Sequence, residues 1–131
     1  MERDTRCILS FGVVYARDWN SLQQLILDAP PARSYFSDGF ATYAQLMYPT
    51  GSVYTCVTDK SQTFAVEADN AELRHYLARL ARRSRCFSRE LWALGRAVAL
   101  FVHAWNRRQT FKRRYPKLSA HLTDFLDDLK P

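Results

Sequence analysis

The segment from Thr63 to Ser88 reads TFAVEADNAELRHYLARLARRSRCFS, and it decides how the rest of the chain is interpreted. Its apolar side chains recur near one side of a helix, at Val66, Leu73, Leu77 and Leu80. Glu67 lies roughly a quarter to a third of a turn from that side, so it can face sideways out of a packed helix. The segment then becomes strongly basic within about three turns. We therefore expect a helix that can hold a divalent metal ion at its head and a polyanion along the rest.

The chain has an uneven charge distribution behind its formal net charge of +6. Residues 1 to 73 carry 5 Lys and Arg against 9 Asp and Glu, a net charge of −4. Residues 74 to 131 carry 14 against 4, a net charge of +10. Clustered positive charge of this kind favours a polyanionic partner, and nucleic acid is the commonest. A solvated Arg-rich surface is the alternative interpretation.

The composition predicts one domain with a real core. The chain has 131 residues, of which 47% are apolar and 14% aromatic. Arg96 interrupts the longest apolar run, which falls short of the roughly 20 residues that span a bilayer. The N-terminus does not resemble a signal peptide, so we expect a cytoplasmic protein without a membrane partner. The three cysteines form no CxxC pair, and we expect them to be small buried hydrophobic residues.

Strand patterns and helix patterns alternate in the first half of the chain and give way to helices in the second. Alternating or β-branched runs predict strands at residues 7–15, 33–37 and 52–58. Helical periodicity predicts helices at residues 21–29 and 40–48, from Glu67 onward, from Ser88 into a basic run at 106–117, and at 119–129. We therefore expect a single α/β or α+β domain over 1–131, with a strand and helix part at 1–62 and a helical basic part at 63–131.

Two carboxylates occupy positions that suit metal chemistry. Asp38 follows a predicted strand and precedes Gly39, while Glu67 begins a helix after another predicted strand. Sheet and helix could bring both to one edge, where paired carboxylates bind Mg²⁺ or Mn²⁺ and serve phosphodiester cleavage and joining. A turn role for Asp38 and a helix-dipole role for Glu67 are the alternative interpretations.

Three blocks carry a recognisable pattern: DTRCIL at 4–9, YFSDGFATY at 35–43, and the segment 63–88. The second is similar to Y-x-[ST]-D-x-(aromatic)-x-x-Y, a motif of bacterial insertion-sequence transposases of the type named "IS one". The third resembles their block T-x-x-(V/I)-E-x-x-N-x-x-L-R…R-L-x-R…C-(aromatic)-S, and the first resembles their hairpin pattern D-x-x-T-(K/R)-x-(I/V)-L. The resemblance covers most of residues 4–126.

The resemblance implies an RNase-H-like mixed sheet followed by a C-terminal helical region, with an Asp-Asp-Glu triad that binds Mg²⁺ or Mn²⁺. By motif match Asp38 is like the second Asp, Glu67 is like the Glu, and Asn70 would order metal water or substrate; capping a neighbouring loop is the alternative for Asn70. The family's first Asp lies on a first strand upstream of the hairpin, so we expect this sheet to lack that strand. We therefore expect an N-terminally truncated DNA transposase core that is inactive alone. The alternatives are a non-catalytic DNA-binding or regulatory remnant and, less favoured, an unrelated helical adaptor.

Basic residues form two clusters, one after Glu67 and one after the second long predicted helix. We expect DNA backbone contacts from Arg74, Arg79, Arg82, Arg83, Arg85, Arg89, Arg107, Arg108, Lys112, Arg113 and Arg114. Trp105, Phe111 and Tyr115 interleave with the second cluster, where they either stack on unpaired bases or anchor the core. The resemblance implies transposon ends and target DNA as partners, within a homo-oligomer or a mixed complex with full-length transposase.

Overall fold

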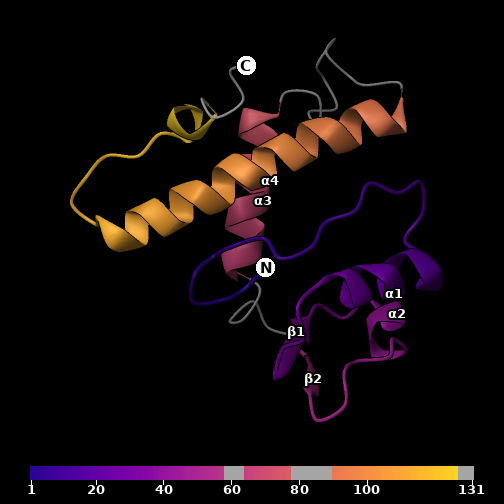
Figure 1. The fold of residues 1–131 in the computed structure, drawn as a ribbon. Helices are drawn as coiled ribbons and strands as arrows, with labels where there is room; N and C mark the ends of the chain where they lie inside the picture. Colours follow the sequence, from indigo (N-terminus) through magenta and orange to yellow (C-terminus); the bar gives the residue numbers. More distant parts are fainter. Residues whose placement is uncertain (58–63, 78–89, 127–131) are drawn as a thin grey trace. The chain divides into compact units, whose positions relative to one another are not determined.

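The computed structural model describes residues 1–57, 64–77 and 90–126, which Figure 1 shows as a ribbon. Its elements are, in chain order, α1 Trp19–Asp28, β1 Ser34–Ser37, α2 Ala41–Ala44, β2 Val53–Cys56, α3 Phe64–Tyr76, α4 Leu91–Arg114 and the 3₁₀ helix η2 Leu122–Phe125. The expected mixture of helix and strand is therefore confirmed. The chain forms two compact units, which we call the terminal unit (Met1–Leu9 with Glu72–Pro131) and the sheet unit (Ser10–Ala71).

A two-stranded parallel sheet, β1 beside β2, lies in the sheet unit. Its register pairs Ser34 with Val53 and Ser37 with Cys56. The ladder continues past β2, where the backbone N–H of Val57 donates to the carbonyl oxygen of Ser37 at 2.9 Å. Parallel strands require a crossover connection, and here it passes through α2. The strands predicted at 33–37 and 52–58 are therefore confirmed as β1 and β2, with residue 58 outside the described residues, and they end at the same edge of the sheet.

A tyrosine cluster packs the loop after α2 against the strands. Tyr35 of β1 and Tyr54 of β2 are register partners. The ring of Tyr48 stacks on Tyr54 with 4.9 Å between centroids, and it lies 4.8 Å from the ring of Tyr35. The Tyr48 hydroxyl also donates to the carbonyl oxygen of Tyr43 at 2.8 Å. Aromatic packing thus links the crossover to the short sheet.

The helix predicted at 21–29 is confirmed as α1, which begins at Trp19, two residues earlier than predicted, because Asp18 caps it. The Asp18 carboxylate accepts the backbone N–H of Ser21 at 2.7 Å. On the buried side, the Gln23 amide accepts the Met47 N–H at 2.7 Å and donates to the Met47 carbonyl at 2.9 Å. The backbone of Met47 is therefore hydrogen-bonded to the Gln23 side chain and not to the backbone of a preceding helical turn. This bonding explains why the helix predicted at 40–48 is helical only over Ala41–Ala44.

The strand predicted at residues 7–15 is wrong, because this stretch pairs with no strand in the described part of the chain. The Asn106 side chain is instead hydrogen-bonded to the backbone of Ile8, which lies in this stretch. The Ile8 N–H donates to Asn106 Oδ1 at 2.7 Å, and Asn106 Nδ2 donates to the Ile8 carbonyl at 2.9 Å. Further along, a Cβ at Gly12 would lie 3.1 Å from Cδ2 of Leu25, so close approach to α1 favours glycine there. High β propensity gives a strand only where a partner strand is available.

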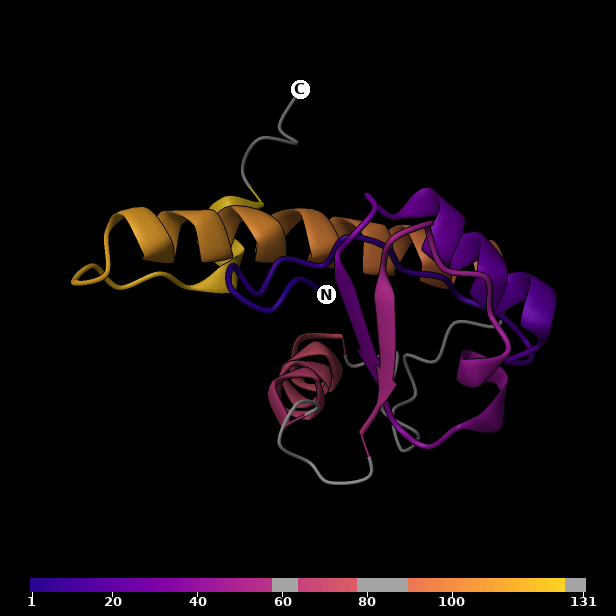
Figure 2. The same ribbon diagram turned by 90° about the horizontal axis from the view of Figure 1, so that it is seen from below.

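The core of the terminal unit lies along α4. Phe101, Ala104 and Trp105 are at most 3% exposed, and Leu122 of η2 packs with them. Phe101 and Trp105 stack with 5.5 Å between ring centroids, while Trp105 Nε1 donates to the Arg6 carbonyl oxygen at 2.9 Å. Figure 2 shows η2 lying beside the long α4. Of the two interpretations of Trp105, the structure supports the core anchor.

The other predicted helices are confirmed in their described parts with one exception. Helix α3 covers the head of the 63–88 segment, and residues 78–88 of that prediction lie outside the described residues. Helix α4 begins at Leu91 and runs through most of the predicted basic run. The helix predicted at 119–129 is instead the 3₁₀ helix Leu122–Phe125, and residues 127–129 lie outside the described residues. No helix in the described part is long and apolar enough to cross a membrane.

The burial predicted for the cysteines is only partly correct. Cys7 is half-buried, and Cys56, at the end of β2, is exposed. Both are free thiols. Cys86 lies outside the described residues.

Candidate nucleic-acid interface

Asp38 is the first residue after β1, at the carboxyl end of the parallel sheet. Its side chain is exposed, and its Oδ1 atom accepts the backbone N–H of Phe40 at 3.2 Å. The other carboxylate oxygen has no hydrogen bond within the described residues. Asp38 therefore has the turn role through one carboxylate oxygen, while its side chain is exposed to solvent.

Glu67 lies in the first turn of α3 and is exposed. A carboxylate in this position is stabilised by the helix dipole. Asn70, about one helical turn later, is exposed as well, whereas the neighbouring Asp69 is only 6% exposed. Glu67 and Asn70 thus both reach solvent from the first half of the helix.

The two carboxylates supply oxygen donors of the kind that Mg²⁺ and Mn²⁺ prefer. No group of three or more His, Cys, Asp or Glu side chains that could hold a metal ion is present among the described residues. Mg²⁺ is often held by one or two carboxylates, with water and substrate phosphates completing its shell. In chemical type, the carboxylates of Asp38 and Glu67 are ligands that such an ion accepts.

Four basic side chains lie along one side of α4, which we call the basic face: Arg96, His103, Arg107 and Arg114. Their separations of 7, 4 and 7 residues correspond to about two, one and two helical turns, so they share that side. All four are exposed. At 1.5 Å per residue the row is about 27 Å long, which matches the rise of roughly eight base pairs of duplex DNA.

Arg108, in contrast, is held within the terminal unit. Its Nη1 donates to Glu72 Oε2 at 3.0 Å, and its Nε donates to the Ala120 carbonyl oxygen at 3.0 Å. The guanidinium carbon lies 5.6 Å from the centroid of the Trp105 ring. With its side chain only 14% exposed, Arg108 stabilises the fold and presents little surface to a polyanion.

The last turn of α4 adds further positive charge through Lys112 and Arg113, which are exposed together with Arg114. Cations at this end also stabilise the helix through its dipole. Arg74 is exposed in the last turn of α3. Of the other residues predicted to contact DNA, five lie outside the described residues: Arg79, Arg82, Arg83, Arg85 and Arg89.

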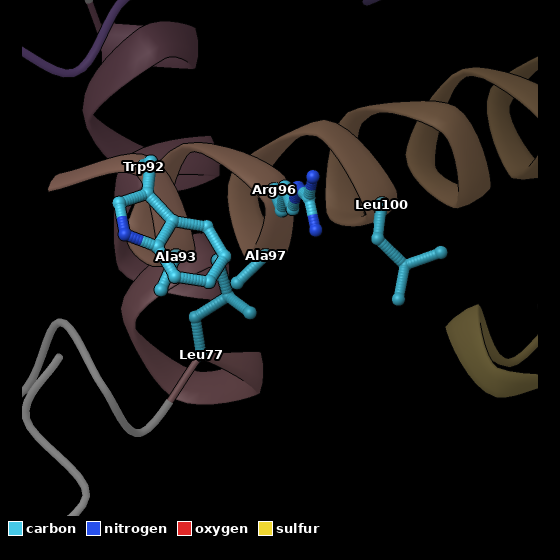
Figure 3. Close-up of a pocket in the computed structure, with 6 residues that line it drawn as sticks. All are labelled: Leu77, Trp92, Ala93, Arg96, Ala97 and Leu100. Carbon is cyan, nitrogen blue, oxygen red and sulfur yellow. The ribbon is translucent and has the colours of Figure 1, made fainter. Parts of the chain in front are cut away.

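A shallow apolar groove lies next to the N-terminal end of the basic face (Figure 3). It has a volume of about 470 Å³ and is lined by Leu77, Trp92, Ala93, Arg96, Ala97 and Leu100. Trp92 is 63% exposed, and the guanidinium carbon of Arg96 lies 5.0 Å from the centroid of its ring. Trp92, Arg96 and His103 were not among the residues predicted to contact DNA.

The spacing of the basic face was the signal that could have identified Arg96 and His103. The two predicted basic clusters contain residues that are close together in the chain, and Arg96 and His103 stand apart from the run that begins at Arg107. Projecting residues 91–114 onto one helix would have placed all four side chains together.

Compared with known proteins, the chain matches no family model, no curated protein and no solved structure.

Proposed function

We propose that this chain is a segment of an Asp-Asp-Glu transposase core, of RNase-H-like type, that binds DNA through the basic face of α4. The observation that carries the proposal is the alignment of four exposed basic side chains along about 27 Å of one helix. The three Arg side chains of this row can neutralise phosphates and release counterions. The motif resemblance of residues 35–43 and 63–88 supports the choice of a transposase.

Within this proposal Asp38 and Glu67 bind a divalent metal ion. Mg²⁺ or Mn²⁺, when bound, activates a water or 3′-hydroxyl and stabilises the leaving oxygen of a phosphodiester. The turn at Asp38, fixed by the Phe40 N–H, orients one carboxylate, and the first turn of α3 presents the other. Asn70 orders a water or the substrate near Glu67. The parallel β1–β2 pair with its helical crossover would be part of the RNase-H-like sheet.

A second candidate function is DNA binding without cleavage, as a regulatory protein that joins full-length transposase. This candidate uses only the basic side chains of α4, which are exposed. Both candidates require the basic face. They differ in whether Asp38 and Glu67 contribute to metal-dependent strand cleavage, which transposon-end DNA with Mg²⁺ would reveal.

The salt dependence of duplex DNA binding tests the proposal common to both candidates. Replacing Arg107 and Arg114 together with Gln should flatten the slope of log affinity against log salt by about 2, because two phosphate contacts are removed. Arg33→Gln in the sheet unit is a matched control, since Arg33 is exposed and lies outside the basic face. The proposal fails if the wild-type protein binds no duplex at low salt, which is the result expected of a helical adaptor.

A further inference from the structure

Trp92 is exposed to solvent, which is unusual for so large an apolar side chain. It lies in the first turn of α4 with 63% of its area exposed, although an indole ring is among the largest apolar groups a protein can bury. Figure 3 shows the ring over the groove, close to Leu77 and Ala93. An exposed aromatic side chain at the edge of an apolar groove marks a surface that can take a flat ligand.

The groove combines apolar walls with one positive charge. Leu77, Ala93, Ala97 and Leu100 provide the apolar lining. The Arg96 guanidinium, 5.0 Å from the Trp92 ring centroid, is the charged group. Aromatic rings and guanidinium planes both stack on nucleobases, and every base has a flat face that such a surface accepts. A volume of about 470 Å³ falls within the range of small-molecule sites, so a single base fits.

Arg96 belongs to both the groove and the basic face. A DNA strand whose phosphates follow the row from Arg114 through Arg107 to Arg96 would therefore bring its next nucleotide to the groove. A paired base stays within the duplex stack, whereas an unpaired base at a strand end can turn out and stack elsewhere. The charge next to the groove favours a nucleotide over an uncharged apolar side chain.

We propose that the groove formed by Trp92, Arg96 and their apolar neighbours binds an unpaired nucleobase of the DNA strand that lies along the basic face. This inference rests on the proposed DNA-binding function and adds a preference to it. The favoured ligand is a duplex with a short single-stranded end. A fully paired duplex of the same length fills the basic face and leaves the groove without a base.

Two DNA ligands of the same duplex length, one blunt and one with a short overhang, separate this inference from DNA binding itself. The overhang carries 2-aminopurine at its first unpaired position, and stacking on Trp92 should quench its fluorescence. Because stacking contributes about 5- to 150-fold in affinity per base, the wild-type protein should bind the overhang more tightly than the blunt duplex by a factor in that range. Trp92→Ala should abolish the preference and the quenching, and Trp92→Phe should retain part of both.

Tyr15→Ala is the matched control, because Tyr15 is an aromatic residue of the sheet unit that is 89% exposed and is not among the residues that line the groove. It should keep the full overhang preference. Equal wild-type affinities for the two ligands would overturn the base-binding inference and leave DNA binding intact, with an apolar side chain of a protein partner as the better occupant of the groove. Preserved preference in Trp92→Ala, with unchanged circular dichroism, would overturn it as well. Binding of neither ligand at low salt would overturn the proposed function and this inference together.

Discussion

Arg108 of α4 donates a hydrogen bond to Glu72 of α3 at 3.0 Å, and this ion pair joins the two helices within the terminal unit. The pair is asymmetric, because the Arg108 side chain is 14% exposed and that of Glu72 is 46% exposed. Arg108 also donates to the Ala120 carbonyl oxygen, so it connects α4 to the chain just before η2. Arg108, a member of the second basic cluster, thus stabilises the packing of the helix on which the exposed basic residues lie.

The asymmetry predicts different costs for removing the two partners. Arg108→Ala should lower the free energy of unfolding by about 2–3 kcal/mol, because it removes two hydrogen bonds and leaves the Ala120 carbonyl unpaired. Glu72→Gln should lower it by at most about 1 kcal/mol, since an exposed carboxylate gains little from an ion pair. Urea unfolding of both variants, with Asp4→Asn as the control for an exposed carboxylate, measures these costs. Equal effects of the two substitutions would contradict the asymmetry.

Asn106 predicts a second stability effect, because it binds the backbone of Ile8 at both its N–H and its carbonyl oxygen. Asn106→Ala should lower the free energy of unfolding by about 2 kcal/mol, since two hydrogen bonds are lost and two backbone groups are left without partners. The Ile8 amide should also exchange its hydrogen faster, which nuclear magnetic resonance can follow residue by residue. Thr110→Ala, which removes a single bond to the Asn106 carbonyl, should cost less than half as much. An Ile8 amide that exchanges equally slowly in Asn106→Ala would show that the contact is not what protects it.

Local signals in the sequence predicted several elements correctly. Asp18 sets the start of α1, and the alternating residues around Tyr54 give β2. Such signals act over a few residues, so they can be found in one dimension. The paired positions of Asp38, after a strand, and Glu67, at the head of a helix, followed from the same local patterns. Their proposed role as metal ligands rests on the motif resemblance and on the chemistry of their carboxylates.

The elements that the sequence did not predict depend on distant contacts. The contact between Ile8 and Asn106 spans 98 positions. No local sequence pattern predicts that an asparagine side chain will make the backbone hydrogen bonds that a partner strand would otherwise make. In the same way Gln23 binds the backbone of Met47, 24 positions ahead, and so prevents α2 from continuing beyond Ala44. The structural role of Arg108 could not be predicted, because an Arg side chain has the same charge whether it contacts DNA or pairs with Glu72. Propensity and charge are weak predictors wherever one distant side chain makes the decisive hydrogen bond.

Tyr48 predicts a pH dependence of stability. Burial, followed by the neighbouring Tyr54, Tyr43 and Tyr35, raises the pKa of Tyr48 to about 12 from an ordinary value of about 10. Between these values the unfolded chain has lost the Tyr48 proton and the folded chain keeps it. The contribution of protonated Tyr48 to the stability of the fold is therefore fully present below pH 10 and is lost as the pH rises to about 12.

The test of this pH dependence compares the wild-type protein with Tyr48→Phe, whose residue 48 does not titrate. At neutral pH the variant should be less stable by about 1 kcal/mol, because it loses the hydrogen bond to the Tyr43 carbonyl oxygen. The difference should narrow as the pH approaches 12, since only the wild-type protein loses the contribution of Tyr48. Urea midpoints measured at pH 8 to 12 give both results. Parallel curves for the two proteins would show that Tyr48 does not titrate in the expected way.

The proposed metal ligands predict a binding effect that does not depend on catalysis. Asp38→Asn and Glu67→Gln should each weaken Mn²⁺ binding by about tenfold or more, because each removes a negatively charged oxygen donor. Electron paramagnetic resonance of free Mn²⁺ measures the affinity directly. Asp4→Asn removes an exposed carboxylate elsewhere and should leave the affinity unchanged. Mn²⁺ binding that is equal in all four proteins would remove Asp38 and Glu67 from the proposal.

A gain of charge tests the basic face without damaging it. Ala99 is exposed in α4 and lies between Arg96 and His103, three and four residues from them, so a lysine there would extend the row. Ala99→Lys should steepen the slope of log affinity against log salt by about 0.9 and raise the affinity for duplex DNA several-fold at low salt. Ala16→Lys, in an exposed loop of the sheet unit, gives the same net charge and should have a smaller effect. If both lysines raise the affinity equally, net charge alone attracts the DNA and α4 has no special role.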